Sequence, residues 1–125
     1  MGKFRKPQAM FWPVKVKLAK GKNKYDTEEI QIKFVRLSKD DLMELIEKVN
    51  FDDDADLSKS EKASITREFN DDIISHIVDW KIEEESGEPM EFNDENLDAV
   101  MNHIVYATAI IKGFWDFQNG GAGKN

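Results

Sequence analysis

The chain has 125 residues, of which 40% are hydrophobic and 34% charged. This length and balance predict one globular domain over residues 1–125, with residues 1–9 and 119–125 as flexible tails. The absence of cysteine excludes disulfides, thiolate catalysis and cysteine-based zinc sites. No apolar run in the sequence approaches the roughly 20 residues that a membrane helix needs, so no membrane partner is expected.

The net charge of −7 is unevenly distributed along the chain. Residues 1–24 hold eight Lys or Arg and no acid, whereas residues 25–125 hold ten Lys or Arg against 25 Asp or Glu. Because most of the surface would repel phosphates, this distribution argues against nucleic-acid binding. The basic N-terminal end can contact either an acidic partner or the acidic remainder of its own chain.

An alternation of apolar and polar residues within residues 12–37 predicts an antiparallel pair of strands, because period two is typical of a half-buried strand. Residues 21–27 are polar and are expected to form the loop between the strands. Lysines on the solvent-facing side of the hairpin are expected to discourage its edges from pairing with those of other molecules. The apolar positions of the alternation are Val14, Val16, Leu18, Ile30, Ile32 and Phe34.

Two helices are predicted after this hairpin, each from a capping-box pattern followed by an apolar stripe. The first begins at Ser38, with Asp41 three residues later, and is short. The second begins at Ser58, with Glu61 three residues later, and is expected to end near Trp80. The stripe of the first is Leu42, Leu45, Ile46 and Val49, and that of the second is Phe69, Ile73, Ile77 and Trp80.

A second, small β-hairpin is predicted near residues 80–92, with the dipeptide Ser86-Gly87 as its turn. Glutamates would face water, and the core side would carry Trp80, Ile82, Met90 and Phe92.

Asn93 is expected to cap the next helix. Its stripe runs from Leu97 to Phe117, as one long helix or as two joined near His103, and Gly120 can supply the left-handed C-cap. The predicted fold class is therefore α+β, with two hairpins packed against about four helices.

An acidic loop precedes the second predicted helix and invites comparison with a calcium-binding loop. Ala55 stands where an EF-hand needs glycine for its sharp turn, and Asn50 replaces the leading aspartate. We therefore interpret the segment as a solvated loop and predict no metal site in it. The residues at the positions that hold calcium in an EF-hand loop are Asn50, Asp52, Asp54, Asp56, Ser58 and Glu61.

His76 lies near two carboxylates in the sequence, with Asp72 four residues before it and Asp79 three after. On a continuous helix, all three could share one face as a partial metal or acid–base group. The other interpretation is an exposed histidine among carboxylates, which we favour because such spacings are common on helix surfaces. His103 is the only other histidine, and no nucleophile motif is present, so we predict no catalytic residue, no cofactor and no enzyme activity.

The order of these features resembles the small tail assembly chaperones of long-tailed bacteriophages and their prophage relatives. The stretches that carry the resemblance are WPVKV, FVRLSKDDL and IVDWKIEEESGEPMEFNDENL, followed by a closing helix. The likeness is clearest over residues 73–104. We interpret the motif residues as structural. They are Trp80, Gly87, Pro89, Phe92, Asn93 and Leu97.

The resemblance implies a non-enzymatic protein that acts while virions are assembled. Such chaperones bind the long helical tape-measure protein and help to recruit tail-tube subunits. They act in the cytoplasm of the bacterial host and are not retained in the mature virion. Neither nucleic acid nor a membrane is an expected partner, and a homo-oligomer is left open.

The closing helix carries more apolar residues than one buried face needs, so we expect a partner helix to bind on its outer side or in the groove beside Trp80. Phe114 and Phe117 fit the core stripe, whereas Trp115 falls beside it and is expected to be partly exposed. The candidate protein-binding residues are Trp80, Met101, Ile104, Phe114 and Trp115.

Two other functions compete with the chaperone. One is a structural virion component, such as a tail-terminator or head–tail joining protein, which stays in the particle. The other is a small metal-binding regulator that uses His76 and the acids near it.

Overall fold

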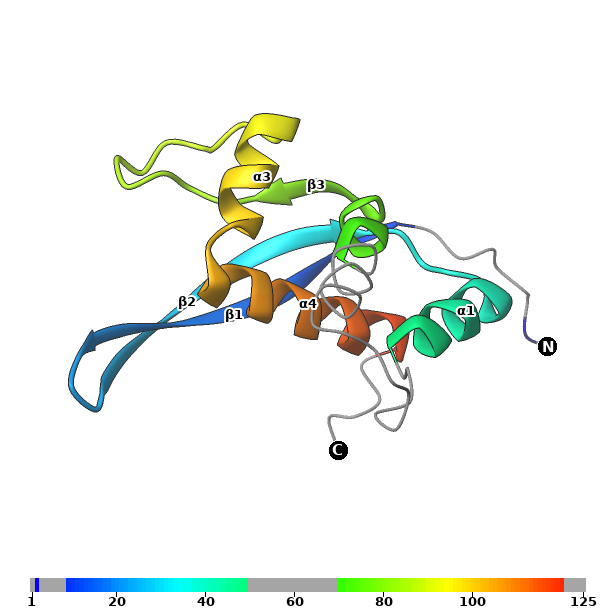
Figure 1. Ribbon diagram of the computed structural model, residues 1–125. Coiled ribbons are helices and arrows are strands. Elements are labelled where there is room, and N and C mark those ends of the chain that lie inside the picture. Colours follow the sequence, from blue (N-terminus) through cyan, green and yellow to red (C-terminus); the bar gives the residue numbers. More distant parts are fainter. Residues whose placement is uncertain (1, 3–8, 50–69, 121–125) are drawn as a thin grey trace.

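The computed structural model describes residues 2, 9–49 and 70–120 (Figure 1). In chain order, the elements are β1 (Met10–Gly21), β2 (Lys24–Phe34), α1 (Lys39–Val49), β3 (Ile77–Lys81), α3 (Asp94–Met101) and α4 (Ile104–Gln118). A helical segment at residues 70–74 directly precedes β3. The α+β class predicted from the sequence is confirmed.

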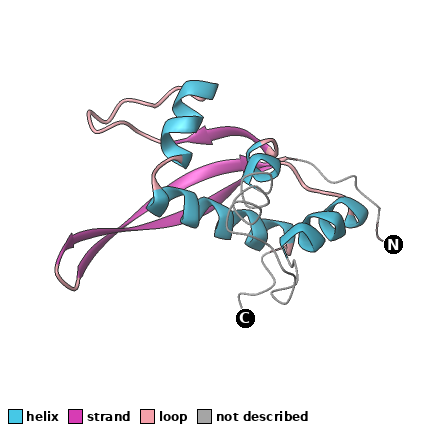
Figure 2. Cartoon of the chain, in the orientation of Figure 1, coloured by secondary structure: helices cyan, strands magenta, loops and turns pink. Residues whose placement is uncertain are grey.

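The three strands form one antiparallel sheet in the order β1-β2-β3 (Figure 2). The predicted β1–β2 hairpin is confirmed, and Val14 pairs with Ile30 so that both apolar side chains face the core. The predicted loop at residues 21–27 is wrong, because β1 runs to Gly21 and β2 restarts at Lys24. In this stretch the two strands stay paired, but their side chains face water on both sides of the sheet. The sequence therefore shows no apolar alternation, although the backbone pairing continues.

The second predicted helix ends earlier than expected. The helical segment stops at residue 74, a turn follows, and Ile77 begins β3, so the expected end near Trp80 is wrong. Trp80 lies instead in the sheet, opposite Ile32 of β2.

A β-bulge explains why the sequence of β3 has the apolar spacing of a helix. Phe34 pairs with Ile77 and Lys33 pairs with Asp79, so Val78 is an extra residue on the β3 side. The bulge reverses the alternation of faces, and Ile77 and Trp80, three residues apart, are therefore both buried. A spacing of three is also what one face of a helix shows.

The chain after β3 folds back on itself around the predicted turn at Ser86 and Gly87. Gly87 has a φ of 92°, which favours glycine. The backbone amide of Met90 donates to the carbonyl of Ile82 at 2.7 Å. The returning segment makes only an isolated bridge, Glu83 with Pro89, and so the predicted second hairpin is a loop without two regular strands.

The apolar pattern after Asn93 forms two helices, and a break at Asn102 and His103 separates α3 from α4. Gly120 has a φ of 71° and its amide donates to the carbonyl of Phe117 at 2.9 Å, which confirms the predicted left-handed C-cap. Within the described ranges, none of the helices has the length and apolarity required to cross a membrane.

Helix α4 packs across one face of the sheet, against β1 and β2 (Figure 1). The Phe34 ring meets Phe114 edge-on at 5.7 Å and stacks on Phe117 at 5.8 Å. Trp12 meets Phe117 edge-on at 5.6 Å, so the closing helix packs on the N-terminal strand. The core is thus a sheet face covered by one helix, with α3 at one end.

The predicted start of α1 is also confirmed. Ser38 accepts a hydrogen bond from the Asp41 amide at 3.2 Å, and Leu45 is buried in the core. The acidic loop from Asn50 to Glu61, the Ser58 cap and Phe69 lie outside the described residues, as do most of the two predicted tails.

Candidate partner-binding face

Trp80, one of the residues that carry the resemblance, joins the sheet to the loop that follows β3. The indole is 5% exposed, and its Nε1 donates to the backbone carbonyl of Met90 at 2.9 Å. The ring of Phe92 meets the indole edge-on, with centroids 5.1 Å apart. The loop after β3 is therefore anchored at its base, because Trp80 lies in the sheet and its indole is hydrogen-bonded to Met90 on the far side of the loop.

Asn93 links this loop to α3. Its Oδ1 accepts a hydrogen bond from the Asn96 amide at 2.8 Å, which is the predicted N-cap. Asn96 Nδ2 donates to the carbonyl of Glu91 at 2.8 Å, and Leu97 is buried one turn into the helix. Asn93 and Leu97 thus have structural roles at the start of α3.

An open groove of about 520 Å³ lies between α3 and the helical segment at residues 70–74. We call it the α3 groove. Its apolar lining comes mainly from Ile74 and Met101, both partly buried, and its rim carries three carboxylates. The lining residues are Asn70, Asp71, Ile74, Glu95, Asp98, Ala99, Met101 and Asn102.

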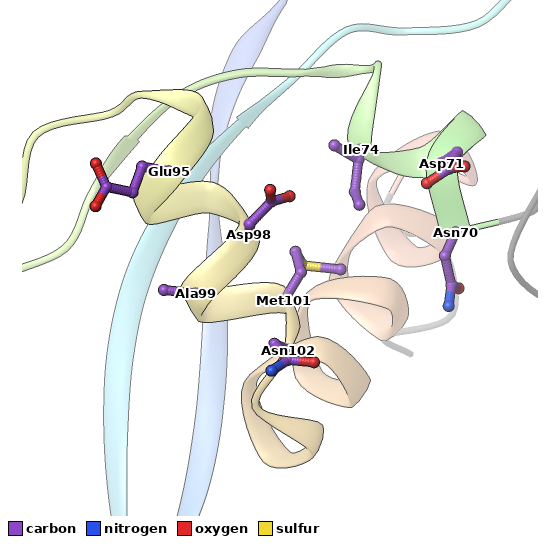
Figure 3. A pocket seen from close by; sticks show the side chains of 8 residues that line it. All are labelled: Asn70, Asp71, Ile74, Glu95, Asp98, Ala99, Met101 and Asn102. Atoms are coloured by element: carbon purple, nitrogen blue, oxygen red, sulfur yellow. The ribbon is translucent and has the colours of Figure 1, made fainter.

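Figure 3 shows how these side chains lie. Ile74 from one wall and Asp98 and Met101 from the other point into the space between the two helical segments. Among the described residues, the lining includes neither lysine nor arginine. Such a groove offers apolar contact at its centre and negative charge at its rim, and this combination suits an amphipathic helix with basic flanks.

Exposure divides the five predicted binding residues. Ile104, at the start of α4, is 76% exposed, and Met101 lines the α3 groove, so both are available to a partner. Trp115 is partly exposed as predicted, and its ring meets Phe114 edge-on at 5.4 Å. Phe114 is fully buried and Trp80 nearly so, because both complete the core of the sheet. The prediction that Phe114 contacts a partner is therefore wrong. Trp80 also lines an open cavity of about 470 Å³, so the predicted groove beside Trp80 stays a prediction.

The predicted grouping of His76 with two aspartates depended on a continuous helix, which the structure does not have. His76 lies in the turn before β3, and its Nδ1 donates to the backbone carbonyl of Asp72 at 2.7 Å. Asp79 lies on β3, where its carboxylate accepts from the Trp80 amide at 2.8 Å. Within the described part of the chain, no three acidic or histidine side chains are placed to hold a metal ion.

Sequence reasoning missed the carboxylates of the α3 groove. No binding role is predicted from the sequence for Glu95, Asp98 or Asp71. The signal available was the i, i+3 spacing of Glu95 and Asp98, which places both on one side of α3. Their position opposite Asp71 depends on the tertiary fold.

No family model matches the chain. No curated protein and no solved structure matches it either.

Proposed function

We propose that this protein is a tail assembly chaperone of a long-tailed phage or prophage, which binds the tape-measure protein and helps to recruit tail-tube subunits without enzymatic activity. The observation that carries the proposal is the resemblance over residues 73–104. In the structure, its six motif residues include a tryptophan, a phenylalanine and an asparagine cap that together hold one loop against α3. The α3 groove, with a wall formed by that same helix, supports the proposal by offering a surface for a partner.

The binding step follows from the composition of this face. An unassembled tape-measure chain presents amphipathic helices to solvent, and covering their apolar side keeps the chain soluble. Met101, Ile74 and Ile104 would contact the apolar stripe, and Asp71 and Asp98 would meet basic flanks. Exposed charge pairs of this kind contribute little affinity, so the complex can be displaced as the tube assembles.

Co-purification with the tape-measure protein tests this assignment. Replacing Ile104 with Asp, or Met101 with Asp, places a charge in the apolar contact, and we expect binding to weaken about tenfold or more. Met43→Asp is the matched control, because Met43 is 48% exposed on α1, away from the α3 groove. Circular dichroism should show the same fold for all three variants. Equal capture by all three would contradict the assigned face.

Trp115→Ala tests the other candidate on the closing helix. If the outer side of α4 takes part, this change weakens co-purification while the circular dichroism spectrum stays unchanged. If capture is unaltered, only the start of α4 and the α3 groove remain as the binding face.

The proposed place of action is the host cytoplasm before the tail is complete. Mass spectrometry of purified virions distinguishes this from the competing assignment. A chaperone is absent from the mature particle, whereas a tail-terminator or head–tail joining protein is present in a fixed copy number.

A further inference from the structure

Two open cavities adjoin each other around Tyr106, and we call them the Tyr106 cavities. One, of about 470 Å³, lies between β2 and the loop after β3. The other, of about 520 Å³, lies between that loop and the last turn of α3. The residues that line both cavities are Ile82, Glu83, Met90 and Tyr106.

Helix α3 separates the Tyr106 cavities from the α3 groove. Ala99 lines the larger cavity as well as the α3 groove, and Figure 3 shows it on the side of the helix away from Ile74. Val100 and His103 line the cavity and not the groove, whereas Met101 lines the groove and not the cavity. The last turn of α3 is therefore a ridge with an open space on each flank.

The Tyr106 cavities resemble the α3 groove in composition. Ile82 is 7% exposed, and Met90 and Tyr106 are partly buried, so the surface shared by the two cavities is largely apolar. Exposed glutamates surround it, accompanied by a single lysine. These charged lining residues are Glu28, Glu29, Glu83, Glu84, Glu85 and Lys81. A segment with an apolar stripe and basic flanks therefore fits here for the same reason that it fits the α3 groove.

We propose that the Tyr106 cavities are a second docking site for a basic amphipathic helix, so that one chain holds two such helices, one on each flank of α3. The inference rests on the proposed function, in which the α3 groove holds one helix of the tape-measure protein. Tyr106 is the expected anchor of the second site, because it lines both cavities and tyrosine is enriched among the residues that dominate binding energy.

The spacing of the two sites follows from helix packing. Packed helices lie about 8–10 Å apart, so two helices on opposite flanks of α3 would have axes roughly 16–20 Å apart. A flexible connection of about 12 residues spans such a distance. Two neighbouring helices of one partner can therefore bind the same chain together, and the second then binds at a raised effective concentration.

Titration calorimetry with a synthetic amphipathic helix of leucine and lysine counts the sites. We expect two peptides per natural chain and one per Met101→Asp chain, because the new charge lies only in the α3 groove. Tyr106→Ala should weaken the other binding event about tenfold. Tyr25→Ala is the matched control and should keep both events, because Tyr25 is 56% exposed on the β1–β2 hairpin and lines none of these cavities.

The count also separates this inference from the proposed function. A single peptide per natural chain, lost in Met101→Asp, would overturn the second site and leave the proposed function in place. Two bound peptides, with no co-purification of the tape-measure protein, would overturn the proposed function and leave the two docking sites in place.

Charge reversal tests the second site without a change in the core. Glu83→Lys with Glu84→Lys reverses the charge around the Tyr106 cavities and should weaken the second event about tenfold. Glu88→Lys with Glu91→Lys changes the net charge equally in the same part of the chain, but neither residue lines a cavity, so both events should remain. Equal weakening by the two pairs would show attraction to overall charge alone and would overturn the proposal.

A tandem peptide tests whether both sites can be filled at once. Two copies joined by a Gly-Ser linker of about 12 residues should bind the natural chain about a hundredfold more tightly than one copy. The gain should disappear in Met101→Asp and in Tyr106→Ala, because each leaves one strong site. A tandem peptide that binds no more tightly than the single peptide would show that the two sites do not act together, and would overturn the proposal.

Discussion

Gln118 is a single buried polar side chain that joins two distant parts of the chain. It is 8% exposed, its Oε1 accepts from the Leu37 amide at 3.0 Å, and its Nε2 donates to the Val35 carbonyl at 2.8 Å. Arg36 lies over the Phe117 ring at 4.3 Å and covers the same junction. The last turn of α4 is therefore fixed to the segment between β2 and α1.

Replacing Gln118 with Leu should destabilise the fold by about 1–3 kcal/mol, because two partly buried backbone groups lose their partner while the side-chain volume is kept. Urea unfolding followed by tryptophan fluorescence measures the change. Thr108→Ala, exposed on the same helix, is the control and should shift the free energy of unfolding far less. A Leu variant as stable as the natural chain would mean that water replaces both bonds.

Asn93 allows a second prediction at the residue scale. Asn93→Ala removes the side-chain acceptor for the Asn96 amide, and the loss of such a cap typically costs about 1 kcal/mol. Thermal unfolding measures this loss. Asn93→Ser should restore most of it, since serine also caps helices well. If Ala and Ser variants unfold alike, the cap contributes nothing measurable.

At the scale of elements, the close approach of α4 to β1 depends on Gly113. A Cβ built on Gly113 would lie 2.7 Å from Cγ2 of Val14, which is closer than packed side chains tolerate. Both residues are buried, so the contact lies in the middle of the interface between the helix and the sheet. A residue with a side chain at this position would push the helix away from the strand.

Gly113→Ala should therefore destabilise the fold by about 1–3 kcal/mol through overpacking, although alanine is the better helix former. Combining it with Val14→Ala, which removes the clashing methyl groups, tests the cause. In a double-mutant cycle by urea unfolding, the two changes should cost less together than the sum of the single costs. Additive costs would show that the contact with Val14 is not the reason.

At the scale of the whole molecule, negative charge and apolar surface are found together near α3, while the core sheet lies behind it. The α3 groove joins Ile74 and Met101 to three carboxylates, and the loop after β3 adds exposed glutamates. Within the described residues, this distribution places three carboxylates around one candidate surface. It is consistent with a partner that is both apolar and basic.

Neither the loop from Asn50 nor the acids near His76 are expected to hold a metal ion. The loop from Asn50 lacks the EF-hand glycine at Ala55, and His76 donates to a backbone carbonyl. Adding Ca²⁺ or Zn²⁺ should therefore leave the midpoint of thermal unfolding unchanged. A specific site at about 100 times its dissociation constant would add about 2.7 kcal/mol and raise the midpoint clearly. Such a rise would favour the metal-binding regulator instead.

The sequence by itself determined the features that depend on neighbouring residues. The alternation around Val14 and Ile30 predicted the hairpin, and Ser38, Asn93 and Gly120 marked helix ends, because strand faces and caps are set by short-range chemistry. Only the tertiary structure decided the rest. The bulge at Val78 made a strand look like a helix, since a spacing of three satisfies both. Burial of Phe114, pairing of Gln118 with residues more than 80 positions away, and the position of Asp71 opposite α3 depend on long-range packing, which local patterns do not encode.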